Sequence, residues 1–144
     1  MLITNHVLAG ALIGDRLPTP AAAVAGFVSH FAMDTLPHYG FMGAFPLDIS
    51  LAKKDGVLGL VVIAGCASAA RPERRLAVLA GIFGACLPDT DKLGEYFVGR
   101  SPWPVWVDAF HKRIQREAGH RMPVEIATGA ALAALAFTLL PRAR

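Results

Sequence analysis

The chain has 144 residues and a formal net charge of +3, and 54% of its residues are hydrophobic while only 17% are charged. This length suits one domain with its own core, and the mean hydropathy of +0.46 is higher than soluble globular proteins usually show. The basic residues are scattered and are not interleaved with aromatic residues, which argues against nucleic acid as a primary partner. We therefore expect a single domain over residues 1–144 that contacts lipid, with a soluble, buried bundle as the alternative.

Prolines and charged residues divide the sequence into helical segments joined by loops. In chain order, the predicted helices cover residues 4–15, 21–36, 51–70, 73–87, 105–118 and 123–140. Pro37 and Pro88 end the second and fourth helices, because a proline disfavours helical geometry in the residue before it. The stretch 92–104 contains two glycines and two prolines and is predicted to be irregular. No strand pattern is found in the sequence.

The predicted fold is an all-α, up-and-down bundle of five to six helices, embedded in a membrane. Its best apolar segments, residues 21–33, 56–70, 76–87 and 124–140, are shorter than the roughly 20 residues of a comfortable bilayer span. Small residues recur four positions apart, as at Gly10 and Gly14 or Gly81 and Ala85. This spacing lets helices approach closely where lipid removes the hydrophobic drive. The more polar helix at 105–118 is predicted to lie on a surface or against the bundle.

Antiparallel neighbours would sort the ionisable residues of the bundle into two poles. We call one the ligand pole, and it collects His6, His30, Asp34, His38, Asp55, Asp89, Asp91, His111 and His120. The other is the arginine pole, and it collects Asp15, Arg16, Arg71, Glu73, Arg74, Arg75, Arg142 and Arg144. Basic residues occur at both poles, so they do not decide the orientation in a membrane.

The most informative stretch of the ligand pole runs from His30 to His38. His30 and Asp34 are four residues apart, so on a helix they point the same way and can share one cation or bind adjacent ones. His38 follows Pro37 and can turn back to the same place. Imidazole together with carboxylate suits zinc, manganese or iron, and the lack of thiolate ligands argues against a closed structural zinc site. The alternative is an ordinary hydrogen-bonded pair at the end of a helix.

Further candidate ligands come from other segments. Asp89 and Asp91 offer two carboxylates on a loop, which fits a second metal ion or, alternatively, a capping turn. His6 is either a ligand or a buried core residue. The predicted metal ligands are therefore His6, His30, Asp34, His38, Asp89 and Asp91, holding one to three divalent ions, with zinc preferred over manganese or iron. Asp55 and His111 are the candidates for catalytic acid or base, although Asp55 also fits a plain surface charge.

The order of these motifs resembles a known family. His6, the HxxxDxxPH segment from His30 to His38, the PDxD segment from Pro88 to Asp91 and the late His111 look like the bacterial family of small membrane-bound metal-dependent hydrolases. More distantly, the HxxxD helix is similar to that of zinc-dependent phospholipases C. The sequence departs from those phospholipases because it lacks their N-terminal Trp and their later HxxxE. The resemblance implies a metal-dependent enzyme in the bacterial inner membrane.

Together these features predict a hydrolase that acts on a phosphoester through a metal-activated water. The substrate is a small molecule or a lipid, membrane lipid is the expected partner, and Lys92, Arg113 or Arg116 would steady an anionic group at the rim. The non-enzymatic alternatives are a membrane protein that binds or transports metal and a structural membrane adaptor. A transporter is expected to place ionisable residues near mid-helix, whereas the centres of the third, fourth and sixth predicted helices are apolar or carry only small polar side chains.

Overall fold

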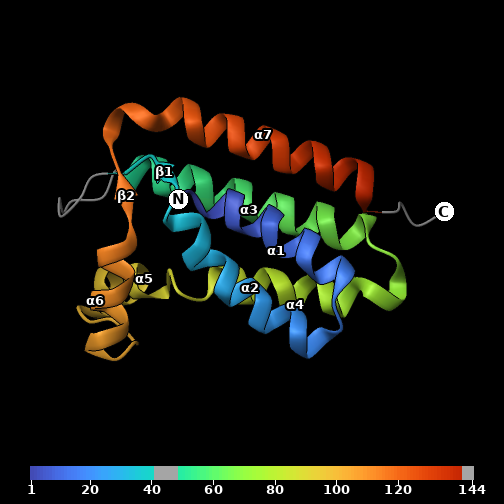
Figure 1. The fold of residues 1–144 in the computed structure, drawn as a ribbon, viewed down its shortest axis with the longest axis horizontal. Coiled ribbons are helices and arrows are strands. Elements are labelled where there is room, and N and C mark those ends of the chain that lie inside the picture. The colour runs from blue at the N-terminus through green and yellow to red at the C-terminus, as the bar shows by residue number, and fades with distance from the viewer. Residues whose placement is uncertain (41–48, 141–144) are drawn as a thin grey trace.

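Helices make up nearly all of the structure (Figure 1). The computed structural model describes residues 1–40 and 49–140. In these residues the helices are α1 (Ile3–Arg16), α2 (Thr19–Asp34), α3 (Ile49–Ala69), α4 (Arg75–Cys86), α5 (Thr90–Val98), α6 (Val105–Ile114) and α7 (Met122–Leu139), with single 3-10 turns at Pro72–Arg74 and Gly119–Arg121. Two short strands, β1 (Pro37–His38) and β2 (Arg116–Glu117), pair in parallel. The predicted all-α fold class is confirmed.

Two predicted helix boundaries are wrong. The stretch 92–104 is not irregular throughout, because α5 covers Thr90–Val98 and ends at Gly99, whose φ of 74° lies in the left-handed region. The helix predicted for 105–118 ends at Ile114, since Gln115 is extended and leads into β2. The N–H of Ala118 then donates to the His38 carbonyl at 3.0 Å, so a strand pairing replaces the last helical turn. Most of the loop after His38 and the tail with Arg142 and Arg144 lie outside the described residues.

Close contacts of α4 with α1 and α2 hold the centre of the bundle together. Gly10 of α1 lies against Gly81 of α4, and a β-carbon at either position would collide with the facing carbonyl oxygen. Gly84 of α4 meets the Ala23 carbonyl of α2 in the same way. The predicted close packing through small residues is confirmed at Gly10 and Gly81. Because backbone touches backbone at these points, the three helices have a fixed spacing.

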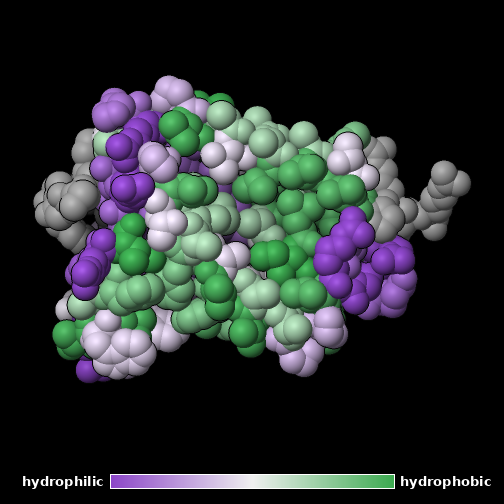
Figure 2. Space-filling view, viewed as in Figure 1, coloured by the Kyte–Doolittle hydropathy of each residue, from purple (hydrophilic) through white to green (hydrophobic). Residues whose placement is uncertain are grey.

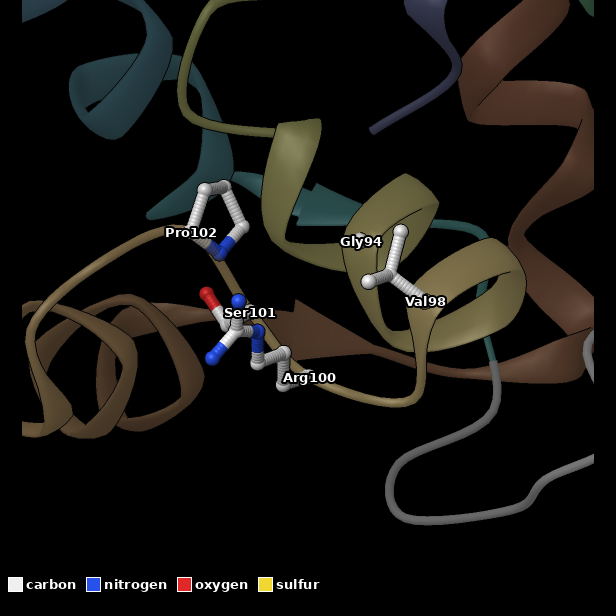
Figure 3. A pocket seen from close by; sticks show the side chains of 5 residues that line it. All are labelled: Gly94, Val98, Arg100, Ser101 and Pro102. Carbon is white, nitrogen blue, oxygen red and sulfur yellow. The ribbon is translucent and has the colours of Figure 1, made fainter.

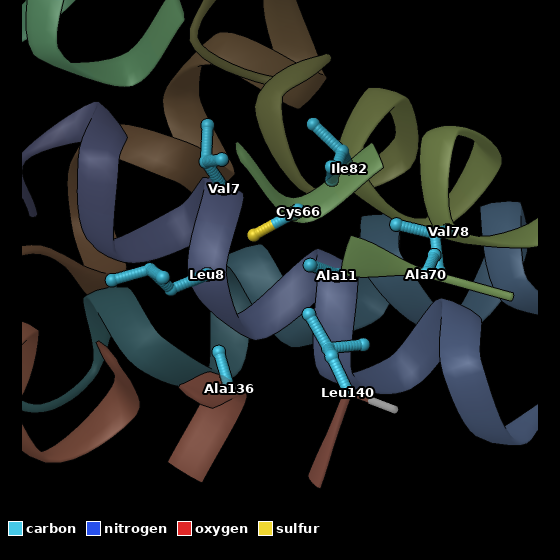
Figure 4. Packing of buried hydrophobic residues seen from close by; sticks show 9 residues of the cluster. All are labelled: Val7, Leu8, Ala11, Cys66, Ala70, Val78, Ile82, Ala136 and Leu140. Atoms are coloured by element: carbon cyan, nitrogen blue, oxygen red, sulfur yellow. The ribbon is translucent and has the colours of Figure 1, made fainter. Parts of the chain in front are cut away.

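The apolar core lies where α1, α3, α4 and α7 meet (Figure 4). It consists mostly of small and medium side chains, namely Val7, Leu8, Ala11, Cys66, Ala70, Val78, Ile82, Ala136 and Leu140. Cys66 and Cys86 are both free thiols. Side chains of this size suit helices that approach closely, because there is little space between the backbones to fill.

Large apolar side chains also cover the outside of the molecule between two polar ends (Figure 2). Among those at least 60% exposed are Val24, Val28, Val57, Leu60, Val61, Leu76, Phe83, Ile126 and Phe137. In the part of the chain that the structure describes, the segment Gly119–Leu139, which contains α7, is long and apolar enough to cross a membrane, and only 11% of its most apolar window is buried. An exposed apolar surface of this extent fits contact with lipid or with a partner protein.

Candidate metal centre

Four ionisable side chains from different parts of the sequence meet inside the ligand pole. His30 and Asp34 lie one turn apart at the end of α2, Asp89 lies directly before α5, and His111 belongs to α6. Each offers one ligand atom, and these four atoms lie within 4.8 Å of one another. We call these residues the His/Asp cluster. Its members come from three segments that the bundle brings together, so the predicted convergence of this part of the ligand pole is present in the structure.

The His/Asp cluster is compact and almost closed to solvent. The Nε2 atom of His30 lies 3.3 Å from Oδ2 of Asp34 and 3.7 Å from Oδ1 of Asp89. The Nε2 atom of His111 lies 3.0 Å from the same Oδ2 of Asp34. The side chains of His30 and Asp34 are fully buried, and that of Asp89 is 13% exposed. These groups are held at distances that a single cation could span after small side-chain movements.

Hydrogen bonds on the far side of each imidazole turn its other nitrogen toward the centre. The Nδ1–H of His30 donates to the Ala85 carbonyl of α4 at 2.7 Å, and the Nδ1–H of His111 donates to Asp91 at 2.9 Å. The two Nε2 atoms therefore face each other at 3.1 Å. Two imidazole lone pairs that meet at this distance need a proton or a cation between them. A carboxylate or carbonyl that fixes the remote nitrogen is also the usual support of a metal-bound histidine.

His6 adjoins the cluster and carries two unpartnered nitrogens. Its ring stacks on that of His30 with the centroids 4.0 Å apart, and its Nε2 lies 3.3 Å from Oδ1 of Asp34. Neither ring nitrogen forms a hydrogen bond, although the side chain is fully buried. Asp34 thus presents Oδ1 to His6 and to the N-terminal ammonium of Met1, which donates to it at 2.8 Å, and Oδ2 to His30 and His111. A buried imidazole without a hydrogen bond is costly, and a bound cation would remove that cost.

Charges around the cluster keep Asp89 and His111 ionised. Lys92 lies 2.5 Å from Asp89, and its side chain is 31% exposed at the rim. Burial alone would raise the pKa of Asp89, but the Lys92 ammonium and two nearby imidazoles lower it well below its usual range. Burial alone would lower the pKa of His111, but hydrogen bonds to Asp34 and Asp91 raise it to about 9. Without a metal, His111 therefore holds a proton between its two carboxylates at neutral pH.

Two polar residues around the cluster have supporting positions. Asp91, predicted as a ligand, binds the Nδ1 side of His111 and lies outside the group of four converging atoms. Gln115 was not singled out by sequence reasoning, yet its amide nitrogen lies 3.1 Å from Nε2 of His111 and 3.4 Å from Asp34. Gln115 follows His111 by one helical turn, and that spacing is the signal that could have indicated it.

Two other predicted site residues are not among the four that form the cluster. His38 is buried in β1, where its Nδ1–H donates to the Leu36 carbonyl at 2.8 Å and its Nε2 lies 3.8 Å from Glu117. Asp55 belongs to α3 and is buried against the start of α1. There it accepts hydrogen bonds from the backbone N–H groups of Ile3 and Thr4 at 2.6 and 3.3 Å. Asp55 therefore satisfies the free amides at the N-terminus of that helix. His111, predicted as an acid or base, lies inside the cluster instead.

Glu125 is a buried carboxylate that sequence reasoning missed. It lies in the first turn of α7 and is 2% exposed. It accepts hydrogen bonds from the N–H of Leu2 at 3.2 Å, the side-chain amide of Asn5 at 2.7 Å and the N–H of Tyr39 at 3.1 Å. A single acidic residue in an otherwise apolar helix was the available signal. Glu125 ties α7 to the start of α1 and to β1.

Comparison with known proteins gives no relative for this arrangement: no protein-family model matches the chain, and neither a curated protein nor a solved structure matches it.

Proposed function

We propose that this chain is a membrane-embedded, metal-dependent hydrolase of phosphoesters. One observation carries the proposal: two imidazole nitrogens and two carboxylates from separate segments direct their lone pairs to one buried centre. The unpartnered nitrogens of His6 beside that centre support it further. Hydrogen bonds on the outer side of His30 and His111 orient both rings for this purpose, which an accidental cluster of polar residues would not require.

The His/Asp cluster would hold the metal through His30, Asp34, Asp89 and His111. Two imidazoles and two carboxylates make a ligand set of nitrogen and oxygen that suits zinc, with manganese and iron as alternatives. When bound, such a cation lowers the pKa of a coordinated water toward about 7 and polarises a phosphoryl oxygen. Asp91 keeps His111 in the tautomer that leaves Nε2 free. His6 is suited either to a further metal or to accepting a proton.

Residues at the rim favour an anionic substrate. The Lys92 ammonium is partly exposed and is already paired with Asp89, a member of the cluster. It can donate to a phosphoryl oxygen without leaving Asp89, because an ammonium has three donors. Asp55 binds the backbone amides at the start of α1 and His111 would bind the metal, so neither is free to transfer a proton in the proposed reaction.

The apolar outer surface supports a place in the membrane. Besides the candidate span Gly119–Leu139, the helices α2, α3 and α4 also expose large apolar side chains. The ligand pole would then lie at the level of the lipid headgroups, with the bacterial inner membrane as the location that the motif resemblance suggests. Separation of membranes and cytosol by centrifugation tests this location, and recovery of the chain in the soluble fraction without detergent would contradict it.

The decisive experiment measures metal content and hydrolysis on the same samples. The purified protein is expected to retain zinc or manganese and to hydrolyse bis(p-nitrophenyl) phosphate, and His30→Ala and Asp34→Ala are expected to lose both. His120→Ala is the matched control, since His120 is exposed in the turn Gly119–Arg121 and lies outside the cluster. Metal binding without hydrolysis of any phosphoester would reject the enzyme and favour a binding or transport protein. Absence of bound metal would reject both.

A further inference from the structure

A shallow apolar hollow lies on the outside of the bundle between α2 and α4. Its lining is Ala23, Val24, Phe27, Phe83, Gly84 and Leu87, and its volume is about 240 Å³. None of these side chains carries a polar atom. Gly84 meets the backbone of Ala23 directly, so the floor of the hollow is the close contact between the two helices. We call this feature the α2–α4 groove.

Both walls of the α2–α4 groove continue into the His/Asp cluster. On α2, Phe27 precedes His30 by three residues, which is about one helical turn. Directly after α4, Leu87 precedes Asp89 by two residues. The Nδ1–H of His30 donates to the carbonyl of Ala85, which lies between the two groove residues Gly84 and Leu87. One end of the groove is therefore next to the proposed metal ligands.

Aromatic side chains close the groove toward α5 and α6. The ring of Phe27 contacts that of Trp103 with centroids 5.9 Å apart, and the indole N–H of Trp103 donates to Thr90 at 3.0 Å. The other parts of the groove open to the apolar outer surface, since Val24 is 65% exposed and Phe83 is 62% exposed. The groove thus runs from the apolar belt of the molecule to a polar end that contains carboxylates, imidazoles and Lys92.

We propose that the α2–α4 groove binds the first part of an acyl chain of a membrane lipid whose phosphoester lies at the His/Asp cluster. This assignment rests on the proposed hydrolase function and narrows its substrate class to lipid phosphoesters. A phospholipid is apolar along its acyl chain and anionic at its headgroup. The apolar α2–α4 groove would match the chain, and the His/Asp cluster with its metal and Lys92 would match the headgroup. A chain already in the bilayer would reach the groove from the side.

A second hollow differs in its chemistry. It has a volume of about 410 Å³ and lies at the turn between α5 and α6, where Gly94, Val98, Arg100, Ser101 and Pro102 line it (Figure 3). Its lining contains a cation and a hydroxyl, and no member of the His/Asp cluster belongs to it. It therefore lacks both the apolar lining and the connection to the proposed metal ligands that the α2–α4 groove has.

The test measures how binding depends on chain length, independently of turnover. Zinc-loaded protein in maltoside micelles is titrated with methyl phosphate and with octyl phosphate by calorimetry. Buried methylenes strengthen binding, so octyl phosphate is expected to bind the wild type at least about 30-fold more tightly than methyl phosphate. Val24→Trp fills the groove and is expected to reduce this preference to about threefold or less. Val28→Trp is the matched control, because Val28 is 60% exposed on the same helix and does not line the groove.

Three outcomes decide whether the α2–α4 groove binds an acyl chain, independently of the hydrolase proposal. A preference for octyl phosphate that Val24→Trp removes and Val28→Trp keeps supports the groove, even if no phosphoester is hydrolysed and the enzyme proposal fails. An equal preference in all three proteins reflects partition into the micelle and overturns the groove, even if a soluble diester is hydrolysed. If Val24→Trp does not fold, Phe83→Ala removes a wall of the groove instead. An unchanged preference in that variant would equally overturn the proposal.

Discussion

Two buried acidic regions lie at the ligand pole, and they differ in what their oxygens bind. Asp55 and Glu125 accept hydrogen bonds from backbone N–H groups, from the Thr4 hydroxyl and from the Asn5 amide, which are all neutral donors. Asp34 and Asp89 face imidazole nitrogens and two charged amines, the N-terminal ammonium at Asp34 and Lys92 at Asp89. Burial of a carboxylate is common to both regions and does not separate them. The identity of the donors separates them: it favours a structural role for the first region and fits the metal site proposed for the second.

The largest expected effect comes from removing the shared ligand of the second region. Asp34→Asn is expected to weaken zinc binding by more than about 100-fold, because Asp34 contacts His6, His30 and His111 together. Zinc per protein after dialysis against buffered zinc measures this. Asp108→Asn is the control, since Asp108 accepts a hydrogen bond from Ser101 and lies outside the cluster. Retention of zinc by Asp34→Asn would erase the distinction between the two regions.

Zinc affinity should depend on pH through His111, whose pKa is raised to about 9. Zinc must displace the proton held there, so affinity is expected to fall about tenfold for each pH unit below 9. His111→Gln should lose most of this slope, and a flat profile in the wild type would contradict the assignment. The metal-free protein should show the opposite trend in stability. Protonated His111 stabilises the fold fully below about 6.5, and this contribution is lost as pH rises through about 9.

Loss of the group that orients His111 should have a smaller effect than loss of a ligand. Asp91→Ala is expected to weaken zinc binding by about 10 to 100-fold, because the Nδ1–H of His111 loses its acceptor and the ring can rotate. Isothermal titration of zinc into chelator-treated protein measures the change. An affinity equal to that of the wild type would show that Asp91 does not support the metal centre.

The smallest expected effect lies in the first region and concerns stability alone. Asp55→Ala leaves the N–H groups of Ile3 and Thr4 without their acceptor, which should lower the free energy of unfolding by about 1–3 kcal/mol. Zinc stoichiometry should not change. Denaturant unfolding in detergent measures the first quantity and metal analysis the second, with Asp108→Ala as the control. Loss of zinc with unchanged stability would reverse the roles given to the two regions.

The sequence predicted the parts of the site that follow from local periodicity. The spacing of His30 and Asp34 on a helix is enough to place both on one face, and antiparallel packing of short-looped helices brings Asp89 to the same end. The helical bundle itself follows from prolines that separate apolar segments. His111 was placed at the correct pole, but its position between Asp34 and Asp91 depends on the angle of α6, which no local pattern specifies.

The features that the sequence did not predict depend on contacts between residues that are far apart in the sequence. Asp55 and His38 carry the same side-chain types as the cluster, and nothing in their neighbours reveals that one meets the backbone amides of α1 and the other a strand pairing. The strands β1 and β2 have two residues each, too few for an alternating pattern. The helix α5 was missed because Gly94 looks like a breaker, although tertiary contact with the backbone of Arg100 is what requires a glycine there.

The direct contact between Gly10 and Gly81 limits where an ion could move through the bundle. Backbone atoms of α1 and α4 touch at mid-bundle, which leaves no width for a file of water molecules along that interface. In a bilayer, a cation at the cluster would therefore not pass between α1 and α4 to the arginine pole.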